Sequence, residues 1–174
     1  LEGNPDVVQS IGASPELRQA LAVGGQFEFG SWQTMLLIFG NNLRALLVIM
    51  LLGMVSFGVL GLMAYTVNTG LIGLVLALVG LSGLDPVQVA LSGILPHGIF
   101  EIPALVLSSA AVLHIGAVLV TPNSRRTLGE VLIEALADWA RIGIGLVVPL
   151  LAIAAAVEAW VTPLFLGPVL SAVP

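Results

Sequence analysis

The sequence predicts an all-α, polytopic helical membrane protein with a broken or re-entrant central segment and one amphipathic interfacial helix. Of the 174 residues, 58% are hydrophobic and 9% are charged, whereas soluble domains carry about 25% charged residues. No Lys or Arg occurs between Arg44 and Arg125, and that interval contains apolar runs of the length that bilayer-crossing helices need. An amphipathic segment at 127–141 follows them.

Composition argues against several classes of protein. The net charge is −5 with only five basic residues, whereas nucleic-acid-binding proteins need a basic surface. The chain has no Cys, which excludes disulfides, thiolate metal sites and cysteine nucleophiles. It contains no G-x-S-x-G, P-loop or H-E-x-x-H motif, so no common hydrolase or ATPase signature indicates an enzyme.

The first 30 residues are the one clearly polar stretch. They contain acids and lack a basic start followed by an apolar core, so we expect no secretory signal peptide. We predict that 1–30 is a cytoplasmic N-terminal segment, that a helical membrane domain occupies 31–165, and that 166–174 is a C-terminal tail.

The membrane domain is predicted to begin at the membrane interface. Residues 31–43, with Trp32, have the composition of an interfacial segment. The first spanning helix is predicted at 44–67, because about 24 residues at 1.5 Å each exceed the roughly 30 Å of a hydrocarbon core. Asn41 and Asn42 precede it, either as a helix cap or as side chains that satisfy the backbone of a docked re-entrant segment.

The next two apolar runs are short. Segments 70–83 and 86–96 have about 14 and 11 residues, whereas a span needs about 17–25. We therefore predict a re-entrant pair, with four short spans before residue 121 as the alternative. Asp85 is the expected cap and Pro86 the first residue of the second short helix. A full span is predicted at 97–120.

An amphipathic helix is predicted after the polar loop that follows residue 120. Thr127 and Glu130 have the spacing of a capping box. Over 127–141, apolar residues fall on one helical face and charged residues on the other, which is typical of a helix lying in the interface. The final span is predicted at 142–161.

The arginines predict the orientation. Arg18 and Arg44 lie at or before the first span, and Arg125, Arg126 and Arg141 lie in the connection before the last. The positive-inside rule places both groups in the cytoplasm, so an even number of crossings must separate them. We expect a multi-pass protein with a cytoplasmic N-terminus.

His97 and Glu101 are the main candidate functional residues. They lie four positions apart in an apolar region that contains no Lys or Arg. An ionisable group inside a membrane costs about 2.5–3.5 kcal/mol or more, so it indicates a functional site. Three interpretations stay open: metal ligands, a proton or ion relay, and a hydrogen-bonded structural pair. His114 is not the expected third ligand, because it lies roughly 220° further round the helix.

Two further polar residues lie in apolar segments. Asn68 belongs to Asn68-Thr69-Gly70, which is first a turn signal and second a polar lining. Glu158 lies about one turn before the end of the final predicted span. It either reaches water or pairs inside the bundle.

Four segments, in order, resemble the stage II sporulation protein M family of integral membrane proteins: Phe39-Gly40-Asn41-Asn42, Asn68-Thr69-Gly70, Pro96-His97-Gly98-Ile99-Phe100-Glu101-Ile102-Pro103-Ala104, and Ala156-Val157-Glu158-Ala159 with Thr162-Pro163. The resemblance covers about 30–165, and the P-H-G-x-x-E run is its most specific part. It implies a prokaryotic plasma membrane protein and, in endospore formers, a place in the membrane-anchored machinery that remodels septal peptidoglycan. Many relatives occur in bacteria and archaea that never sporulate, and no settled activity comes with the family. The polar site that the resemblance implies comprises Asn41, Asn42, Asn68, His97, Glu101 and Glu158.

Three functions are compatible with these residues. The first, preferred, is a non-catalytic membrane scaffold or assembly component with a polar His/Glu/Asn site. The second is a small ion or solute transporter or channel subunit that uses His97 and Glu101. The third is an intramembrane hydrolase in which these two residues bind a divalent metal, the one candidate cofactor. The expected partners are the lipid bilayer and either a second copy or another membrane protein, with no nucleic acid.

A Glu101→Gln substitution separates these functions. It keeps the shape of the side chain and removes its charge, so it should be tolerated if the pair is structural. It should abolish ion binding if the site serves transport or metal-dependent catalysis.

Overall fold

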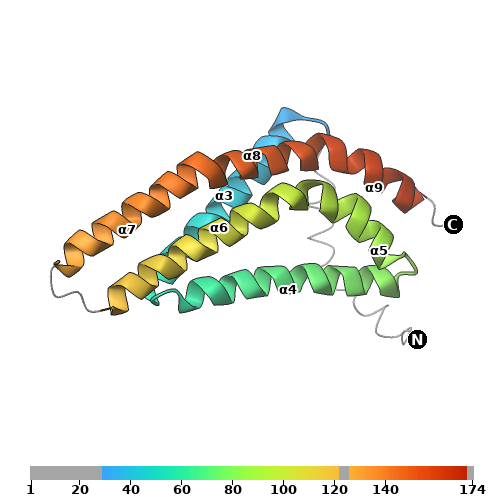
Figure 1. The fold of residues 1–174 in the computed structure, drawn as a ribbon. Coiled ribbons are helices and arrows are strands. Elements are labelled where there is room, and N and C mark those ends of the chain that lie inside the picture. The colour runs from blue at the N-terminus through green and yellow to red at the C-terminus, as the bar shows by residue number, and fades with distance from the viewer. Residues whose placement is uncertain (1–28, 122–125, 172–174) are drawn as a thin grey trace.

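The computed structural model describes residues 29–121 and 126–171, and all regular structure in that part of the chain is helical, as predicted. In chain order the elements are α3 (Trp32–Val55), α4 (Val59–Leu81), α5 (Pro86–Val89), η1 (Ala90–Ile94), α6 (Leu95–Val120), α7 (Leu128–Ile142), η2 (Gly143–Val147), α8 (Val148–Ala156), η3 (Val157–Val161) and α9 (Thr162–Ser171). Elements η1, η2 and η3 are single π-helical segments, and the helical ribbon runs on from α5 into α6 and from α7 through α8 to α9 (Figure 1).

Four helices of the described chain are long and apolar enough to cross a membrane by length and composition: Trp32–Val55, Val59–Leu81, Pro86–Val120 and Leu128–Val169. The last two are composite helices that run through the π-helical segments without a loop. The apolar composition and these four helices together make the chain a membrane protein.

Each π-helical segment precedes a proline by the same spacing. Pro96, Pro149 and Pro163 each lie two residues after the end of η1, η2 and η3, respectively. Proline has no N–H and its ring clashes with the carbonyl four residues earlier, which disfavours a regular α-helical turn there. A wider π turn absorbs the clash, and such turns frequently occur at functional sites. A π-helical interruption lies at η1, but it does not divide the central segment, which continues as one helix from Pro86 to Val120.

The first helix boundary predicted from the sequence is wrong. Residues 31–43 and 44–67 were expected to be an interfacial segment and a separate span, but α3 continues from Trp32 through both to Val55. The chain then turns at 56–58, where Phe57 and Gly58 have φ angles of 54° and 95°. Glycine adopts that left-handed conformation without steric cost. The Ser56 hydroxyl accepts a hydrogen bond from the Leu60 N–H at 2.8 Å, which caps the start of α4.

The two short segments are also corrected. Residues 70–81 are the second half of the 23-residue α4, and 86–96 join 97–120 in one composite helix of 35 residues. Neither is a separate re-entrant half-helix. Asp85 does cap the composite helix, because its carboxylate accepts from the Val87 N–H at 2.9 Å, and Pro86 is the first helical residue.

The expected orientation stays a prediction. Three of the four candidate spans precede residues 121–127, which were predicted to contain a polar loop. If all three cross, the N-terminal segment and this loop lie on opposite sides of the membrane. Three crossings are an odd number, whereas the arginines predicted an even number of crossings. Arg44 is also placed midway along α3 rather than at its start.

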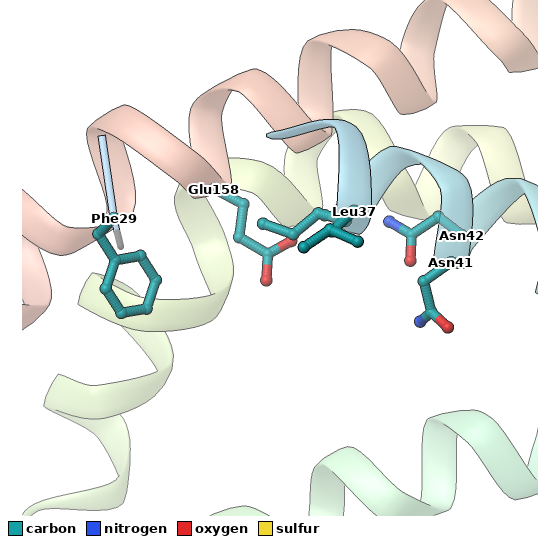
Figure 2. Close-up of a pocket in the computed structure, with 6 residues that line it drawn as sticks. Phe29, Leu37, Asn41, Asn42 and Glu158 are labelled. Atoms are coloured by element: carbon teal, nitrogen blue, oxygen red, sulfur yellow. The ribbon is translucent and has the colours of Figure 1, made fainter. Parts of the chain in front are cut away.

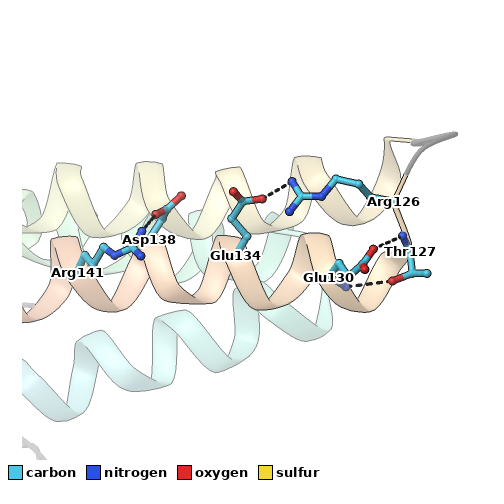
Figure 3. Close-up of polar contacts among 6 residues, drawn as sticks. All are labelled: Arg126, Thr127, Glu130, Glu134, Asp138 and Arg141. Atoms are coloured by element: carbon cyan, nitrogen blue, oxygen red, sulfur yellow. Dashed lines mark hydrogen bonds and ion pairs between the residues drawn. The ribbon is translucent and has the colours of Figure 1, made fainter.

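Helix α7 has the predicted amphipathic pattern and cap. Thr127 and Glu130 form a reciprocal capping box, in which each side chain accepts a hydrogen bond from the other's backbone N–H. Two ion pairs, Arg126 with Glu134 and Arg141 with Asp138, lie along its exposed face (Figure 3). The helix is not isolated in the chain, because η2 joins it directly to α8.

The core lies where α6 meets α3 and the α7–α8 helix (Figure 1). Its centre is a buried cluster of one residue from each of four elements: Leu46, Ala104, Val147 and Leu151. Gly116 allows α6 to approach the turn between α3 and α4 closely, because a Cβ at this position would lie 2.3 Å from the Phe57 carbonyl oxygen. Helix α4 buries none of its apolar window, and the polar residues described below lie on α3, α6, η3 and α9. Helix α9 extends to Ser171, and the predicted tail at 166–174 is therefore helical as far as that residue.

Candidate functional site

His97, Glu101 and Thr162 connect the start of α6 to the start of α9. One helical turn separates His97 from Glu101, and His97 Nε2 lies 3.9 Å from Glu101 Oε2. On its other side, His97 Nδ1 lies 3.4 Å from Thr162 Oγ1. The side chain of Thr162 is buried, whereas those of His97 and Glu101 are 13% and 25% exposed. The contact joins residues 65 positions apart, across the two composite helices.

Glu158 adds a second carboxyl group to this cluster. It lies in η3, one element before Thr162, and its carboxyl group is close enough to that of Glu101 to interact with it electrostatically. Among the described residues, neither carboxyl group accepts a hydrogen bond. The three segments around the cluster, 29–43, 90–104 and 157–171, contain no Lys or Arg. Negative charge at this site therefore has no counter-charge from these segments other than His97 when it is protonated.

A pocket of about 250 Å³ lies beside Glu158. Its lining combines one carboxylate, two amides and three apolar side chains: Glu158, Asn41, Asn42, Phe29, Leu37 and Ile38. In Figure 2, Glu158 and Asn42 extend toward Leu37 from η3 and from α3, whereas Asn41 points away from both. The polar cluster therefore opens on its α3 side into a cavity large enough for more than a bare ion.

The start of α3 is bound to η3 beside this pocket. The Gly30 N–H donates to the Ala159 carbonyl at 2.8 Å, and the Trp160 indole N–H donates to the Gly30 carbonyl at 2.8 Å. Trp32 packs edge to face on Trp160, with ring centroids 4.7 Å apart. Pro163 explains why the Ala159 carbonyl is free to accept, since an α-helix would fill it with the N–H of residue 163. These contacts hold the Phe29 end of α3 at the pocket.

Replacing Pro163 should weaken this attachment. In Pro163→Ala, a new N–H can donate to the Ala159 carbonyl, and Gly30 then competes with a helical hydrogen bond. We expect hydrogen exchange of the Gly30 amide to become severalfold faster, because a local opening that lost about 1 kcal/mol of net hydrogen-bond stabilisation is about fivefold more populated. Pro149→Ala is the matched control, as it also follows a π-helical segment. Equal exchange at Gly30 in both variants would contradict this explanation.

The structure brings together most of the residues that the sequence singled out. His97 lies next to Glu101, Glu101 acts electrostatically on Glu158, and Asn41 and Asn42 share the pocket with Glu158. Asn68 lies inside α4 rather than in a turn, and its side chain is outside the described part of the structure. What these residues do stays a prediction.

Thr162 and Gly30 were missed by the sequence analysis. The signal for Thr162 was its i+4 spacing from Glu158, which repeats the spacing of His97 and Glu101 on α6. The signal for Gly30 was Pro163, four residues after the carbonyl that Gly30 binds.

The donors present do not make a complete metal site. Within 29–121 and 126–171, no three His, Cys, Asp or Glu side chains are grouped as metal ligands. His114 lines a different pocket, between α6 and α7, with Asp138 and Trp139. His97 and Glu101 remain a pair without a third ligand, whereas a catalytic zinc site uses three protein ligands and a water.

Comparison with known proteins identifies the family. The model of the family described as Stage II sporulation protein M matches residues 3–163. The chain belongs to the Stage II sporulation protein M family. The match contains every segment on which the resemblance was based, including the P-H-G-x-x-E run.

One relative aligns with most of this chain. An uncharacterized protein of Methanocaldococcus jannaschii is 29% identical over 141 residues, which are 79% of this chain and 72% of the relative. No solved structure matches the chain. Membership of the Stage II sporulation protein M family therefore supports a membrane protein and leaves the chemistry of the polar residues open.

Proposed function

We propose that this protein is a non-catalytic membrane scaffold or assembly component whose polar site is completed by a cation from outside the chain. The observation that supports this function most is the pairing of Glu101 and Glu158. They come from two different broken helices, interact electrostatically, and accept no hydrogen bond from any described residue.

A self-sufficient structural lock would have a different arrangement. Buried polar groups in folded proteins are nearly always hydrogen-bonded, and charges within a membrane are paired with one another or with backbone groups. Among the described residues, the ion-pair partner of Glu101 is His97, whose Nε2 lies 3.9 Å from Glu101 Oε2, which is too long for a hydrogen bond. A cation, a proton included, would offset the negative charge of these two carboxyl groups, which accept no hydrogen bond from any described residue.

A bound cation would also fix the two composite helices relative to each other. Both helices carry a π-helical segment and a proline at the site, so neither has a regular hydrogen-bond ladder there. A positive charge shared by Glu101 of α6 and Glu158 of η3 replaces electrostatic repulsion between these helices with attraction. The site would thereby hold the bundle in the form that a membrane partner recognises.

The test is the thermal unfolding of the purified protein in detergent with added Na⁺, K⁺, Mg²⁺ or ethylammonium. A ligand that binds only the folded state stabilises it by about 2.7 kcal/mol at 100 times its Kd, so at least one cation should raise the midpoint by several degrees. The Glu101→Gln, Glu158→Gln double variant should show no such rise. Glu134→Gln, which removes a carboxylate on α7, is the control and should respond like wild type. Equal responses in wild type and in the double variant would contradict the proposal.

Transport of the bound cation is the second candidate function. It is favoured by the position of both acids beside breaks in their helices, because secondary transporters place ion sites at discontinuous helices within the membrane. Cation flux into proteoliposomes containing wild type or the double variant would decide between the scaffold and the transporter. Flux of the bound cation above that of the double variant supports transport, whereas binding without flux supports the scaffold.

A further inference from the structure

We propose that the pocket between α3 and η3 binds a primary ammonium group, with Glu158 as its counter-charge. This inference rests on the proposed function in one respect, that the cation at the acid site comes from outside the chain. It adds the chemical class of that cation and the place where it enters.

The lining of the pocket matches the hydrogen-bonding pattern of a primary ammonium. Such a group carries one positive charge and three N–H donors. The lining includes one carboxylate, from Glu158, and the amide side chains of Asn41 and Asn42, each of which has one oxygen that can accept a hydrogen bond. A quaternary ammonium has no N–H to donate and is recognised by a cage of aromatic faces, whereas Phe29 is the one aromatic residue in this lining.

The size of the pocket separates an organic ammonium from a metal ion. Its volume is about 250 Å³, whereas one water takes up about 30 Å³ of liquid volume. A bare monovalent ion would occupy only a small part of this space, and water would fill the rest. The three apolar side chains, Phe29, Leu37 and Ile38, instead suit the carbon atoms attached to an ammonium nitrogen.

The neighbouring tryptophans indicate the depth at which the group binds. Trp32 and Trp160 pack together where the start of α3 meets η3, beside Phe29. Tryptophan is enriched at the level of the lipid headgroups, where its ring spans the apolar and polar regions. The mouth of the pocket is also accessible, since Phe29 and Leu37 are 60% and 61% exposed. Two sources therefore present the same chemistry at this level: the ethanolamine headgroup of a phospholipid and a free primary amine.

Native mass spectrometry of the detergent-solubilised protein tests the proposal. The protein is titrated with phosphatidylethanolamine and phosphatidylcholine of identical acyl chains, and separately with ethanolamine. We expect phosphatidylethanolamine or ethanolamine to bind at least about tenfold more tightly than phosphatidylcholine, because a hydrogen bond to a charged group contributes about 1.5–3 kcal/mol.

Three variants accompany the titration. Glu158→Gln keeps the shape of the side chain and should remove the preference. Asn42→Leu leaves the carboxylate in place and should weaken the preference for the primary ammonium. The proposal therefore stays testable if Glu158→Gln folds poorly. Glu134→Gln changes the net charge equally on α7 and should bind like wild type.

The outcomes separate the sources and the proposals. Selective binding of phosphatidylethanolamine alone identifies a lipid headgroup, and binding of ethanolamine as well identifies a site that needs only the amine. Equal binding of both lipids with no binding of ethanolamine, or a preference that survives in Glu158→Gln, overturns the inference. If such a result is accompanied by cation-dependent unfolding that requires Glu101 and Glu158, the proposed function stands and the ammonium pocket does not.

Discussion

Gly116→Ala is expected to destabilise the protein by about 2–3 kcal/mol, the upper part of the usual range for overpacking a core. A Cβ at this buried position of α6 would lie 2.3 Å from the Phe57 carbonyl oxygen and 2.5 Å from its carbon. These are backbone atoms of the turn between α3 and α4, where Phe57 already has a positive φ. They cannot move aside as a flexible side chain would, so the helices themselves must separate.

The measurement is the midpoint of thermal unfolding in detergent, beside Gly73→Ala. Gly73 lies in α4, and a Cβ there would meet nothing within 4 Å. Since alanine is the better helix former by about 1 kcal/mol, that variant should be as stable as wild type or more stable. If Gly116→Ala unfolds at the same temperature as Gly73→Ala, the close approach of α6 to the α3–α4 turn is wrong.

Removing both carboxylates of the polar cluster is expected to stabilise the protein when no cation is added. In the Glu101→Gln, Glu158→Gln double variant the repulsion between two carboxylates is absent. A buried group that lacks its hydrogen-bond partner costs about 1–3 kcal/mol and more when charged, so a gain of about that size is expected. The measurement is the unfolding midpoint in a buffer whose only cation is a bulky quaternary ammonium.

The exposed ion pairs of α7 provide the comparison for this prediction. Glu134→Gln and Asp138→Asn each break one pair, and exposed pairs contribute about 0–1 kcal/mol. These variants should therefore change stability little. A double variant at Glu101 and Glu158 that is less stable than wild type would show that the two acids hold the fold together without an external cation.

The helical class was predictable because it depends on composition alone. Helix ends were less predictable, since the run from Ala45 to Val67 is apolar on both sides of the turn at 56–58. Asn68-Thr69-Gly70 has the residues of a turn, yet it lies inside α4. Backbone groups in lipid have no water to bind, so a helix is maintained through residues that would end it in a soluble protein. Moving the break from 68–70 to 56–58 turns a short segment into a full-length helix.

The polar site was predictable in part. Glu101 and Glu158 could be singled out because each places an acid in an apolar segment. The proximity of Glu101 and Glu158 could not be predicted, because it depends on how their two helices pack against each other. The two residues are about 57 positions apart, and the helical period of a single segment does not encode that packing. The pocket has the same origin, since its lining comes from α3 and η3.

The most direct test of an external cation at the acid cluster is a ¹³C NMR spectrum of protein labelled at the side-chain carboxyl carbon of glutamate. Single variants Glu101→Gln and Glu158→Gln assign the two resonances, and ethylammonium is then titrated into wild type. We predict that the resonances of Glu101 and Glu158 shift together and saturate, while that of Glu134 does not move. Resonances of Glu101 and Glu158 that stay unchanged with ethylammonium, Na⁺, K⁺ and Mg²⁺ would contradict a cation site at this cluster.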